Sequence, residues 1–226
     1  MTRIEFLGTR ANTDVKTPRH SKHSGVLVDS RILLDVGESE FLENNPEAIF
    51  ITHLHPDHAF FVNNSVNSID VPIYAPEESE EIDIEVISEE TTVGPFTVTS
   101  IPTIHSKIVE STAYLLEDKN RLLYTGDMVW IEKKHHHRFG DLDLVITDGS
   151  FIREGGRVFG DNQGNVWGHK GVPDLIDFFK EYTERIIFTH LGKWLLQDVE
   201  TGKNKMEQFS QVNVELAYDG MVVEIE

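Results

Sequence analysis

The sequence of residues 49–58 is Ile49-Phe50-Ile51-Thr52-His53-Leu54-His55-Pro56-Asp57-His58, the most informative part of the chain. Its apolar first half predicts a buried strand, and Pro56 predicts a turn. Alternate side chains of an extended segment point the same way, so His53 and His55 can converge on one cation. Asp57 and His58 follow the turn and can face a second cation. Imidazole with carboxylate suits zinc, and also manganese or iron.

Two complete coordination shells need more ligands than this stretch supplies, and the best candidates each follow an apolar strand. His105 follows residues 98–104, Asp127 follows residues 122–126, and His190 follows residues 186–189. Strand ends hold reactive groups on a rigid frame in α/β proteins. With the ligands of the first stretch they make five histidines and two aspartates, enough for two cations bridged by a carboxylate and a hydroxide.

The chain has 226 residues, of which 39 are acidic and 20 are basic, so its formal net charge is −19. A hydrophobic fraction of 39% is enough to fill a core, which excludes disorder as the global state. A strongly acidic protein repels polyanions. We therefore expect no extended nucleic-acid partner and no adhesion to anionic membranes.

Cysteine is absent from the sequence. Disulfides, thiolate metal ligands and cysteine nucleophiles are therefore excluded. We recognise no signal peptide, and no run approaches the roughly 20 apolar residues that span a bilayer. We expect a soluble, cytoplasmic protein without a membrane partner, and the sequence leaves a homodimer open.

Short apolar runs bounded by Gly, Pro, Asn or Asp predict a chain dominated by strands. The clearest helix is at residues 173–182, where Pro173 suits the first turn. Shorter helices are predicted at residues 38–44, 57–63 and 203–209. No linker and no internal repeat divides the chain, so residues 1–226 are expected to form one α/β domain. The predicted strands are residues 4–7, 25–28, 32–35, 48–52, 93–101, 112–116, 121–125, 144–147, 186–189 and 221–225.

Two segments have unusual charge. Residues 77–90 are strongly acidic, which favours a solvated edge strand and loop kept unpaired by its charges. Residues 10–22 are locally basic and contain Arg10, Lys16, Arg19 and Lys22. This basic loop matters for function only if it reaches the metal site.

The candidate ligands and their order along the whole chain resemble the metallo-β-lactamase superfamily. The resemblance rests on Asp35-Val36-Gly37 after an early strand, the HLHPDH motif at residues 53–58, His105, Thr125-Gly126-Asp127 and Thr189-His190. It implies an αββα sandwich, with two mixed β-sheets flanked by helices. It also implies that Asp127 bridges two metals and that Asp35 supports the metal-binding loop. The implied ligands are His53, His55 and His105 for one metal, and Asp57, His58 and His190 for the other.

Within the superfamily the chain is similar to ribonuclease Z-like and phosphoribosyl cyclic phosphodiesterase-like proteins. The similarity lies in three segments: Phe6-Leu7-Gly8-Thr9, residues 20–24, and the motif at residues 216–221 near the end of the sequence. The tRNA-processing ribonucleases usually carry a long arm between the third histidine and the bridging aspartate, but here His105 and Asp127 are only 22 residues apart. Those ribonucleases also tend to have a glutamate where this chain has Asp148, which leaves a pair between Asp148 and His169 as a hypothesis.

The resemblance implies a phosphodiesterase that uses two divalent metal ions to hydrolyse a small anionic substrate, nucleotide-like or cyclic. Zinc is the expected metal, with manganese and iron as alternatives. Asp57 is predicted to orient the attacking water or accept its proton, and His169, paired with Asp148, to steady charge or protonate the leaving oxygen. The alternatives are a carboxyl-ester, thioester or lactone hydrolase of the glyoxalase II kind, a tRNA 3′-processing endonuclease without the usual arm, and a metal-binding module without catalysis.

For several further residues the sequence leaves two interpretations open: a contact with the substrate or metal, or an ordinary position in a loop. The histidines of this kind are His20, His23, His135, His136 and His137. Arg153, Arg157 and Lys193 are candidate contacts for an anionic substrate. Trp130, Trp167 and Trp194 are candidates for stacking on a base or ring, although aromatic residues that pack a loop are more common.

Overall fold

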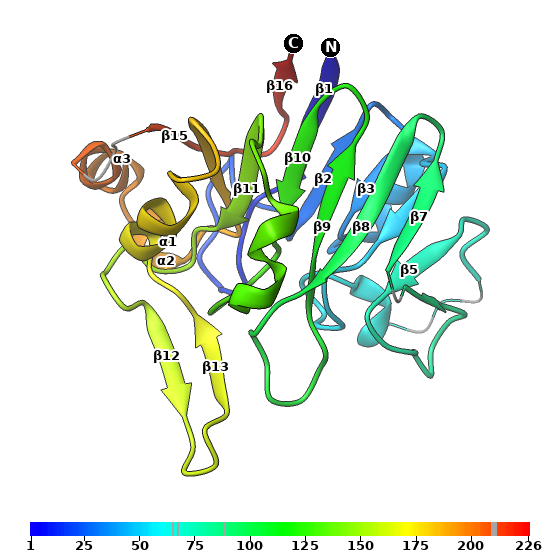
Figure 1. The fold of residues 1–226 in the computed structure, drawn as a ribbon, viewed down its shortest axis with the longest axis horizontal. Helices are drawn as coiled ribbons and strands as arrows, with labels where there is room; N and C mark the ends of the chain where they lie inside the picture. Colours follow the sequence, from blue (N-terminus) through cyan, green and yellow to red (C-terminus); the bar gives the residue numbers. More distant parts are fainter. Residues whose placement is uncertain (65, 67, 88, 209–211) are drawn as a thin grey trace.

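The computed structural model describes residues 1–226 except 65, 67, 88 and 209–211. In this described part, two seven-stranded mixed sheets pack face to face (Figure 1). The first sheet has the order β16 (Met221–Ile225), β1 (Thr2–Gly8), β2 (Gly25–Val28), β3 (Ile32–Leu34), β4 (Ala48–Phe50), β5 (Ile73–Ala75) and β6 (Glu85–Val86). The second has the order β15 (Asn213–Leu216), β14 (Arg185–Thr189), β11 (Leu144–Asp148), β10 (Arg121–Tyr124), β9 (Thr112–Glu117), β8 (Phe96–Pro102) and β7 (Glu90–Val93).

Three apolar clusters hold the layers together. The cluster between the sheets joins side chains such as Phe6 and Leu34 to Tyr114 and Ile146. The outer face of the second sheet is covered by α1 (Val172–Phe179), α2 (Lys193–Leu196) and α3 (Val199–Glu207). The outer face of the first sheet is covered by loops and by the 3₁₀ helices η1 (Ser39–Asn44) and η2 (Phe60–Val62). Because both faces of the central strands are covered, β2, β3, β4 and β11 are buried along their whole length.

Strand direction brings the predicted ligands to one edge of the sandwich. β3 and β4 are parallel neighbours in the first sheet, and β10, β11 and β14 are parallel neighbours in the second. β8 runs in the same direction as β10, because both are antiparallel to β9. The loops that follow these strands therefore leave the sheets together, which is where α/β proteins place reactive groups.

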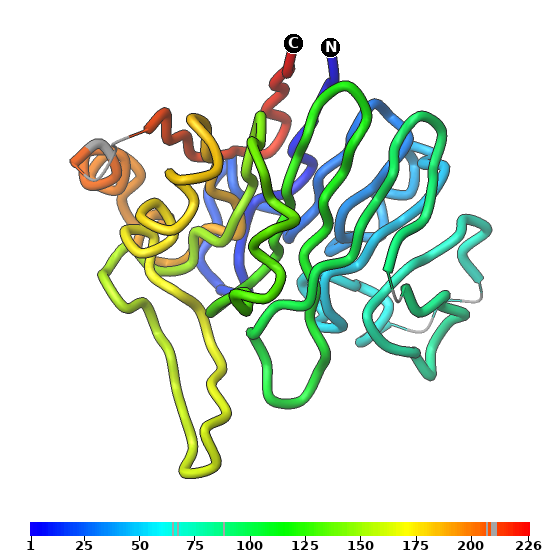
Figure 2. The backbone as a smooth tube through the Cα atoms, viewed as in Figure 1, coloured from blue at the N-terminus to red at the C-terminus, as the bar shows by residue number. Residues whose placement is uncertain are grey.

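A two-stranded hairpin, β12 (Arg157–Gly160) and β13 (Val166–His169), stands apart from both sheets. It projects from the body of the molecule on the side opposite residues 1 and 226, as the trace in Figure 2 shows. Its base lies beside the loop that joins β8 to β9, because the backbone N–H of Gly168 donates to the carbonyl oxygen of His105 at 2.7 Å.

The structure confirms the predicted αββα sandwich, and each predicted strand region contains a strand. The region 93–101 is interrupted by a turn at Gly94, which has a φ of +56° and separates β7 from β8. The acidic segment forms the exposed strand β6 at the edge of the first sheet, as expected. The sequence reasoning missed β5, the β12–β13 hairpin, β15 and α2.

The helix predicted at residues 57–63 is wrong over its first residues, where the chain forms a turn before η2. The carbonyl oxygens of Asp57 and His58 accept from the N–H groups of Ser24 and Val36, so they cannot continue a helical ladder. The short helix predicted at residues 38–44 forms as the 3₁₀ helix η1.

The two other predicted helices form with shifted ends. α1 ends at Phe179 rather than at Tyr182. α3 begins earlier than predicted, at Val199, because the Asp198 side chain caps it by accepting from the N–H of Thr201, and residue 209 lies outside the described residues. No described helix is long and apolar enough to cross a membrane.

Candidate metal centre

The loops at this edge bring all seven predicted ligands into overlapping groups. Within each group, one potential ligand atom per residue lies within 4.8 Å of the others. The described residues form four such groups: His53, His55 and His105; Asp57, His58 and His190; His53, His58 and Asp127; and Asp127, Asp148, His169 and His190.

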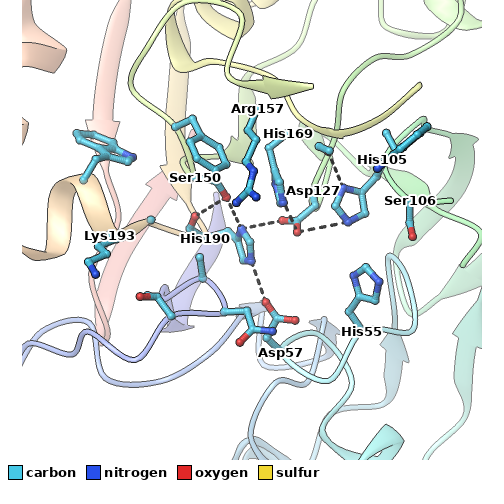
Figure 3. Close-up of a pocket in the computed structure, with 18 of the residues that line it drawn as sticks. His55, Asp57, His105, Ser106, Asp127, Ser150, Arg157, His169, His190 and Lys193 are labelled. Carbon is cyan, nitrogen blue, oxygen red and sulfur yellow. Dashed lines mark hydrogen bonds and ion pairs between the residues drawn. The ribbon is translucent and has the colours of Figure 1, made fainter. Parts of the chain in front are cut away.

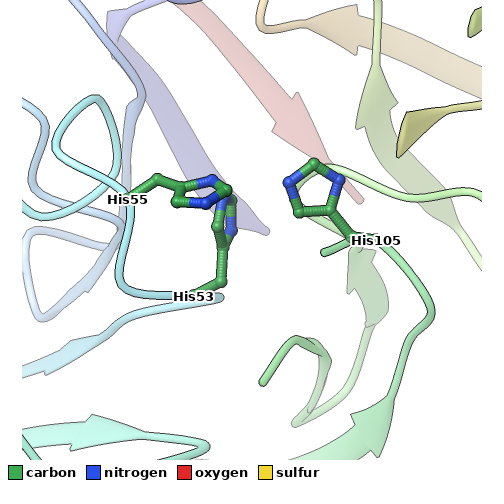
Figure 4. Close-up of side chains that lie close together, drawn as sticks. All are labelled: His53, His55 and His105. Carbon is green, nitrogen blue, oxygen red and sulfur yellow. The ribbon is translucent and has the colours of Figure 1, made fainter. Parts of the chain in front are cut away.

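His53, His55 and His105 form the first trio, with their rings turned toward one another (Figure 4). Their ring centroids are 4.6 Å apart for His53–His55, 4.6 Å for His53–His105 and 5.4 Å for His55–His105. Burial lowers the pKa of His53 well below its ordinary value and that of His105 to about 4. All three rings therefore tend toward the neutral form that binds metals.

Asp57, His58 and His190 form the second trio, which has the opposite electrostatics. Burial would lower the pKa of His58, but the carboxylates of Asp127 and Asp35 outweigh burial and raise it to about 10. The pKa of His190 is raised well above its ordinary value, because the Asp127 carboxylate again outweighs burial. Nε2 of His190 lies 3.0 Å from Oδ2 of Asp57. A divalent cation in this trio would replace protons, since neutral imidazole is the ligand.

Asp127 lies between the two trios, and each of its carboxylate oxygens faces one of them. Figure 3 shows its contacts with His105 on one side and His190 on the other. Oδ2 is 3.9 Å from Nε2 of His53 and 3.7 Å from Nε2 of His105. Oδ1 is 3.4 Å from Nε2 of His58 and 2.9 Å from Nδ1 of His190. Burial would raise the pKa of Asp127, but His190 and His58 hold it well below its ordinary value. Asp127 is thus an anionic group that faces both trios.

The donor atoms themselves fit divalent metals. The Nε2 atoms of His53, His58 and His105 are buried and have no hydrogen-bond partner among the described residues. Buried polar atoms without a partner are costly and rare in folded proteins. Their convergence in one place is accounted for if they bind cations.

Asp35 is fully buried and bonds to the metal-binding loop at Thr52 and His58. Its Oδ2 accepts from Nδ1 of His58 at 2.7 Å and from the hydroxyl of Tyr124 at 2.7 Å. Its Oδ1 accepts from the N–H of Thr52 at 2.7 Å. Because a carboxylate only accepts, the hydrogen of the His58 ring is on Nδ1 and Nε2 is directed at the site.

Backbone conformation at the strand ends is unusual. Asp35 and His190 have φ values of +58° and +51°, in the left-handed region that only a few per cent of non-glycine residues adopt. Gly126, before the bridging aspartate, has a φ of +57°, and a Cβ there would lie 2.5 Å from Oγ1 of Thr52. This close approach requires glycine at residue 126.

Asp148 and His169 form the hypothesised pair. Oδ2 of Asp148 accepts from Nδ1 of His169 at 2.7 Å, and Oδ1 accepts from the N–H of Ser150 at 2.9 Å. Burial would lower the pKa of His169, but the carboxylates of Asp148 and Asp127 raise it. The hydroxyl of Ser150 lies 2.8 Å from Nδ1 of His190. The sequence analysis did not identify Ser150 as a site residue, although it lies only two residues after Asp148.

A cavity of about 630 Å³ opens onto these residues. Its lining includes the candidate site residues His55, Asp57, His105, Asp127, His169 and His190 (Figure 3). Arg157 and Lys193 also line it. Trp167 and Trp194 line it, as do Phe151 and Phe159, which the sequence reasoning did not single out. Residues 11–13 of the basic loop also reach it.

The remaining candidates lie away from this cavity. Arg153 donates to the carbonyl oxygen of Gly156, and Trp130 packs on Phe178 and His136. His20 and His23, at the start of the chain, bond to Thr9 and Glu38. His135, His136 and His137 lie in the 3₁₀ helix η3 (Lys133–Arg138), and none of the five histidines lines the cavity.

Comparisons with known proteins agree with the fold. The chain covers 98% of the metallo-β-lactamase fold protein YhfI from Bacillus subtilis over 98% of its own length, with 19% identity and a TM-score of 0.71. Against a diphosphatase of the PhnP family, 100% of this chain matches 98% of that chain, with 17% identity and a TM-score of 0.72. For zinc-bound PqqB from Methylobacterium extorquens the shares are 99% and 100%, the identity is 14% and the TM-score is 0.64.

Among curated proteins, none matches the chain significantly. The family model described as the β-lactamase superfamily domain matches residues 37–191, which is more than half of the sequence and includes every predicted ligand. The chain therefore belongs to the β-lactamase superfamily and has its metallo-β-lactamase fold.

Proposed function

We propose that this protein is a metal-dependent hydrolase that cleaves a phosphodiester in a small, nucleotide-like or cyclic substrate. The observation that supports it most is the position of Asp127, whose two oxygens face two separate trios of ligands. Such a carboxylate suits two cations that share one ligand, as hydrolases with two adjacent metals use.

His53, His55 and His105 would hold one metal, and Asp57, His58 and His190 the other. Zinc suits these nitrogen and oxygen ligands, with manganese and iron as alternatives. Two divalent ions bound there would supply a hydroxide at neutral pH and would polarise the phosphoryl oxygen.

The chain's own residues supply the remaining chemistry. Asp57 lines the cavity, where its carboxylate orients the attacking water or accepts its proton. His169 keeps Nε2 free for the substrate, because Nδ1 is bonded to Asp148. Nε2 of His169 is the group that protonates the leaving oxygen, and Asp148 positions its ring through Nδ1.

Cationic side chains favour a phosphodiester over an acyl substrate. Arg157 and Lys193 line the same cavity as the ligand groups, in a protein with a net charge of −19. Guanidinium and ammonium groups bind phosphate oxygens well. The likeness to a diphosphatase of the PhnP family, a phosphorus-centred hydrolase by its name, agrees with this preference.

The test is hydrolysis by protein supplemented with zinc or manganese. We expect about two metals per chain, cleavage of bis(p-nitrophenyl) phosphate, and loss of most of this activity in His55→Ala. The matched control is His137→Ala, because His137 is exposed and lies away from the cavity. Turnover of thioesters or lactones alone would favour the glyoxalase II kind, and cleavage of precursor tRNA the endonuclease. Metal binding without hydrolysis of any of these substrates would favour a metal-binding module without catalysis.

A further inference from the structure

The β12–β13 hairpin presents one of its two faces to the cavity. Its register pairs Arg157 with His169 and Phe159 with Trp167. Since side chains alternate along a strand, these four residues share one face, and all four line the cavity. The other face carries Val158 and Val166 opposite two glycines.

Two aromatic rings form a continuous surface on the cavity face. The rings of Phe159 and Trp167 are stacked, with centroids 6.1 Å apart and planes 24° apart. Phe159 is 45% exposed, so its ring is accessible to a ligand in the cavity. We call Phe159 and Trp167 the aromatic platform.

Cations surround this platform. The guanidinium of Arg157 lies 5.3 Å from the centre of the Phe159 ring, and Nζ of Lys107 lies 4.6 Å from that of Trp167. Lys107 also pairs with Asp161 at 3.2 Å, which ties the β8–β9 loop to the hairpin. An anionic ligand that also carries a flat ring matches this combination of charge and aromatic surface.

The platform is fixed relative to the metal centre. Gly168, beside Trp167, exchanges two hydrogen bonds with the predicted ligand His105. Trp167 and His169 are two residues apart on the same face of one strand, so they are separated by roughly 7 Å along it. One sugar ring between a base and a phosphate spans a similar length.

We infer that the aromatic platform stacks against a nucleobase while the phosphodiester lies at the metal centre, so that the substrates are nucleoside phosphodiesters rather than sugar phosphates without a base. This inference rests on the proposed function. An alkyl chain in place of the base would gain apolar contact, but nothing from the stacking geometry or from the two cations.

The kinetic test compares 2′,3′-cyclic AMP with the 2,3-cyclic phosphate of methyl riboside, which has the same phosphodiester and no base. We expect kcat/KM of the zinc-loaded protein to be about 10- to 100-fold higher for the nucleotide. Trp167→Leu, which keeps apolar bulk and loses the ring, should remove most of that preference, and Trp167→Phe should keep most of it. Val158→Ala, on the opposite face, is the matched control and should behave as the parent protein. Equal kcat/KM for the two substrates, or an equal fall for both in Trp167→Leu, would overturn the inference.

A binding test separates this inference from the proposed function. Calorimetry should show tighter binding of AMP than of ribose 5-phosphate by about tenfold, with the difference abolished in Trp167→Leu and kept in Val158→Ala. If the metal-loaded protein hydrolyses neither cyclic phosphate but keeps this difference, the proposed function fails and the platform stands. If both cyclic phosphates are hydrolysed and AMP binds no better than ribose 5-phosphate, the platform fails and the proposed function stands.

Discussion

The ring of His105 donates its Nδ1 hydrogen to the carbonyl oxygen of Gly168, with 2.9 Å between the two atoms. A carbonyl oxygen only accepts, so this bond fixes the tautomer of His105 and leaves Nε2 for a metal. Gly168 has a φ of +116°, and a Cβ on it would lie 2.1 Å from the carbonyl oxygen of Arg157. The hairpin and the metal centre are therefore coupled through a position that only glycine can fill.

We expect Gly168→Ala to weaken metal binding by roughly 10- to 100-fold, as the loss of a partner of a ligating histidine does. Competition with a chromophoric chelator measures this. Gly164→Ala is the matched control, because Gly164 also has a positive φ, of +88°, but a Cβ there meets nothing within 4 Å. Unchanged metal affinity in Gly168→Ala would show that the hairpin does not support His105.

Asp35 offers a second test of the groups that orient the ligands. Asp35→Asn replaces one accepting oxygen by an amide NH₂, which faces the N–H of His58 and the hydroxyl of Tyr124 in one orientation and the N–H of Thr52 in the other. We expect roughly 10- to 100-fold weaker metal binding and a loss of about 1–3 kcal/mol in the free energy of unfolding. Tyr124→Phe, which removes a donor to Asp35 and leaves the bond to His58, should bind metal much more tightly than Asp35→Asn. Chelator competition measures the metal affinity of both variants, and urea unfolding measures their stability. Equal metal affinity in Asp35→Asn and Tyr124→Phe would contradict a role of Asp35 in orienting His58.

The convergence of the proposed ligands was predictable because each follows an apolar strand, and parallel strands bring their ends to one edge. The pair of Asp148 with His169 could only be a hypothesis, since it depends on how the chain after β11 returns to the site. The side of the hairpin on which Trp167 lies was not predictable. Five glycines between residues 155 and 168 hide the strand alternation, and a shift of register by one residue moves a side chain to the opposite face.

Two substrates with different leaving groups distinguish proton donation by His169 from an effect of the variant on metal binding. If Nε2 of His169 protonates the leaving oxygen, His169→Ala should slow 2′,3′-cyclic AMP hydrolysis by roughly 100- to 10,000-fold. Bis(p-nitrophenyl) phosphate should be affected much less, because p-nitrophenolate leaves without a proton. Asp148→Asn should follow the same pattern more weakly, since it acts by positioning the ring. Equal losses for both substrates, at unchanged metal content, would rule out proton donation by His169.

Metal removal should lower the thermal stability of the protein without unfolding it at room temperature. The three apolar clusters do not include the ligands, so the sandwich persists without metal. The buried Nε2 atoms of His53, His58 and His105 gain a partner only when metal binds. A metal present at a thousand times its Kd stabilises the folded state by about 4 kcal/mol. At roughly 2–4 °C per kcal/mol for a chain of this size, we expect chelation to lower Tm by about 8–16 °C.

Differential scanning calorimetry with a chelator, followed by addition of zinc, measures this change. His105→Ala should lose most of the increase in Tm that metal produces, because one trio then has only two ligands. Its Tm in chelator should stay close to that of the parent protein, since the ring of His105 contributes little to the apolar clusters. A parent protein that releases its metal and keeps the same Tm would contradict the assignment of these buried nitrogen atoms as metal ligands.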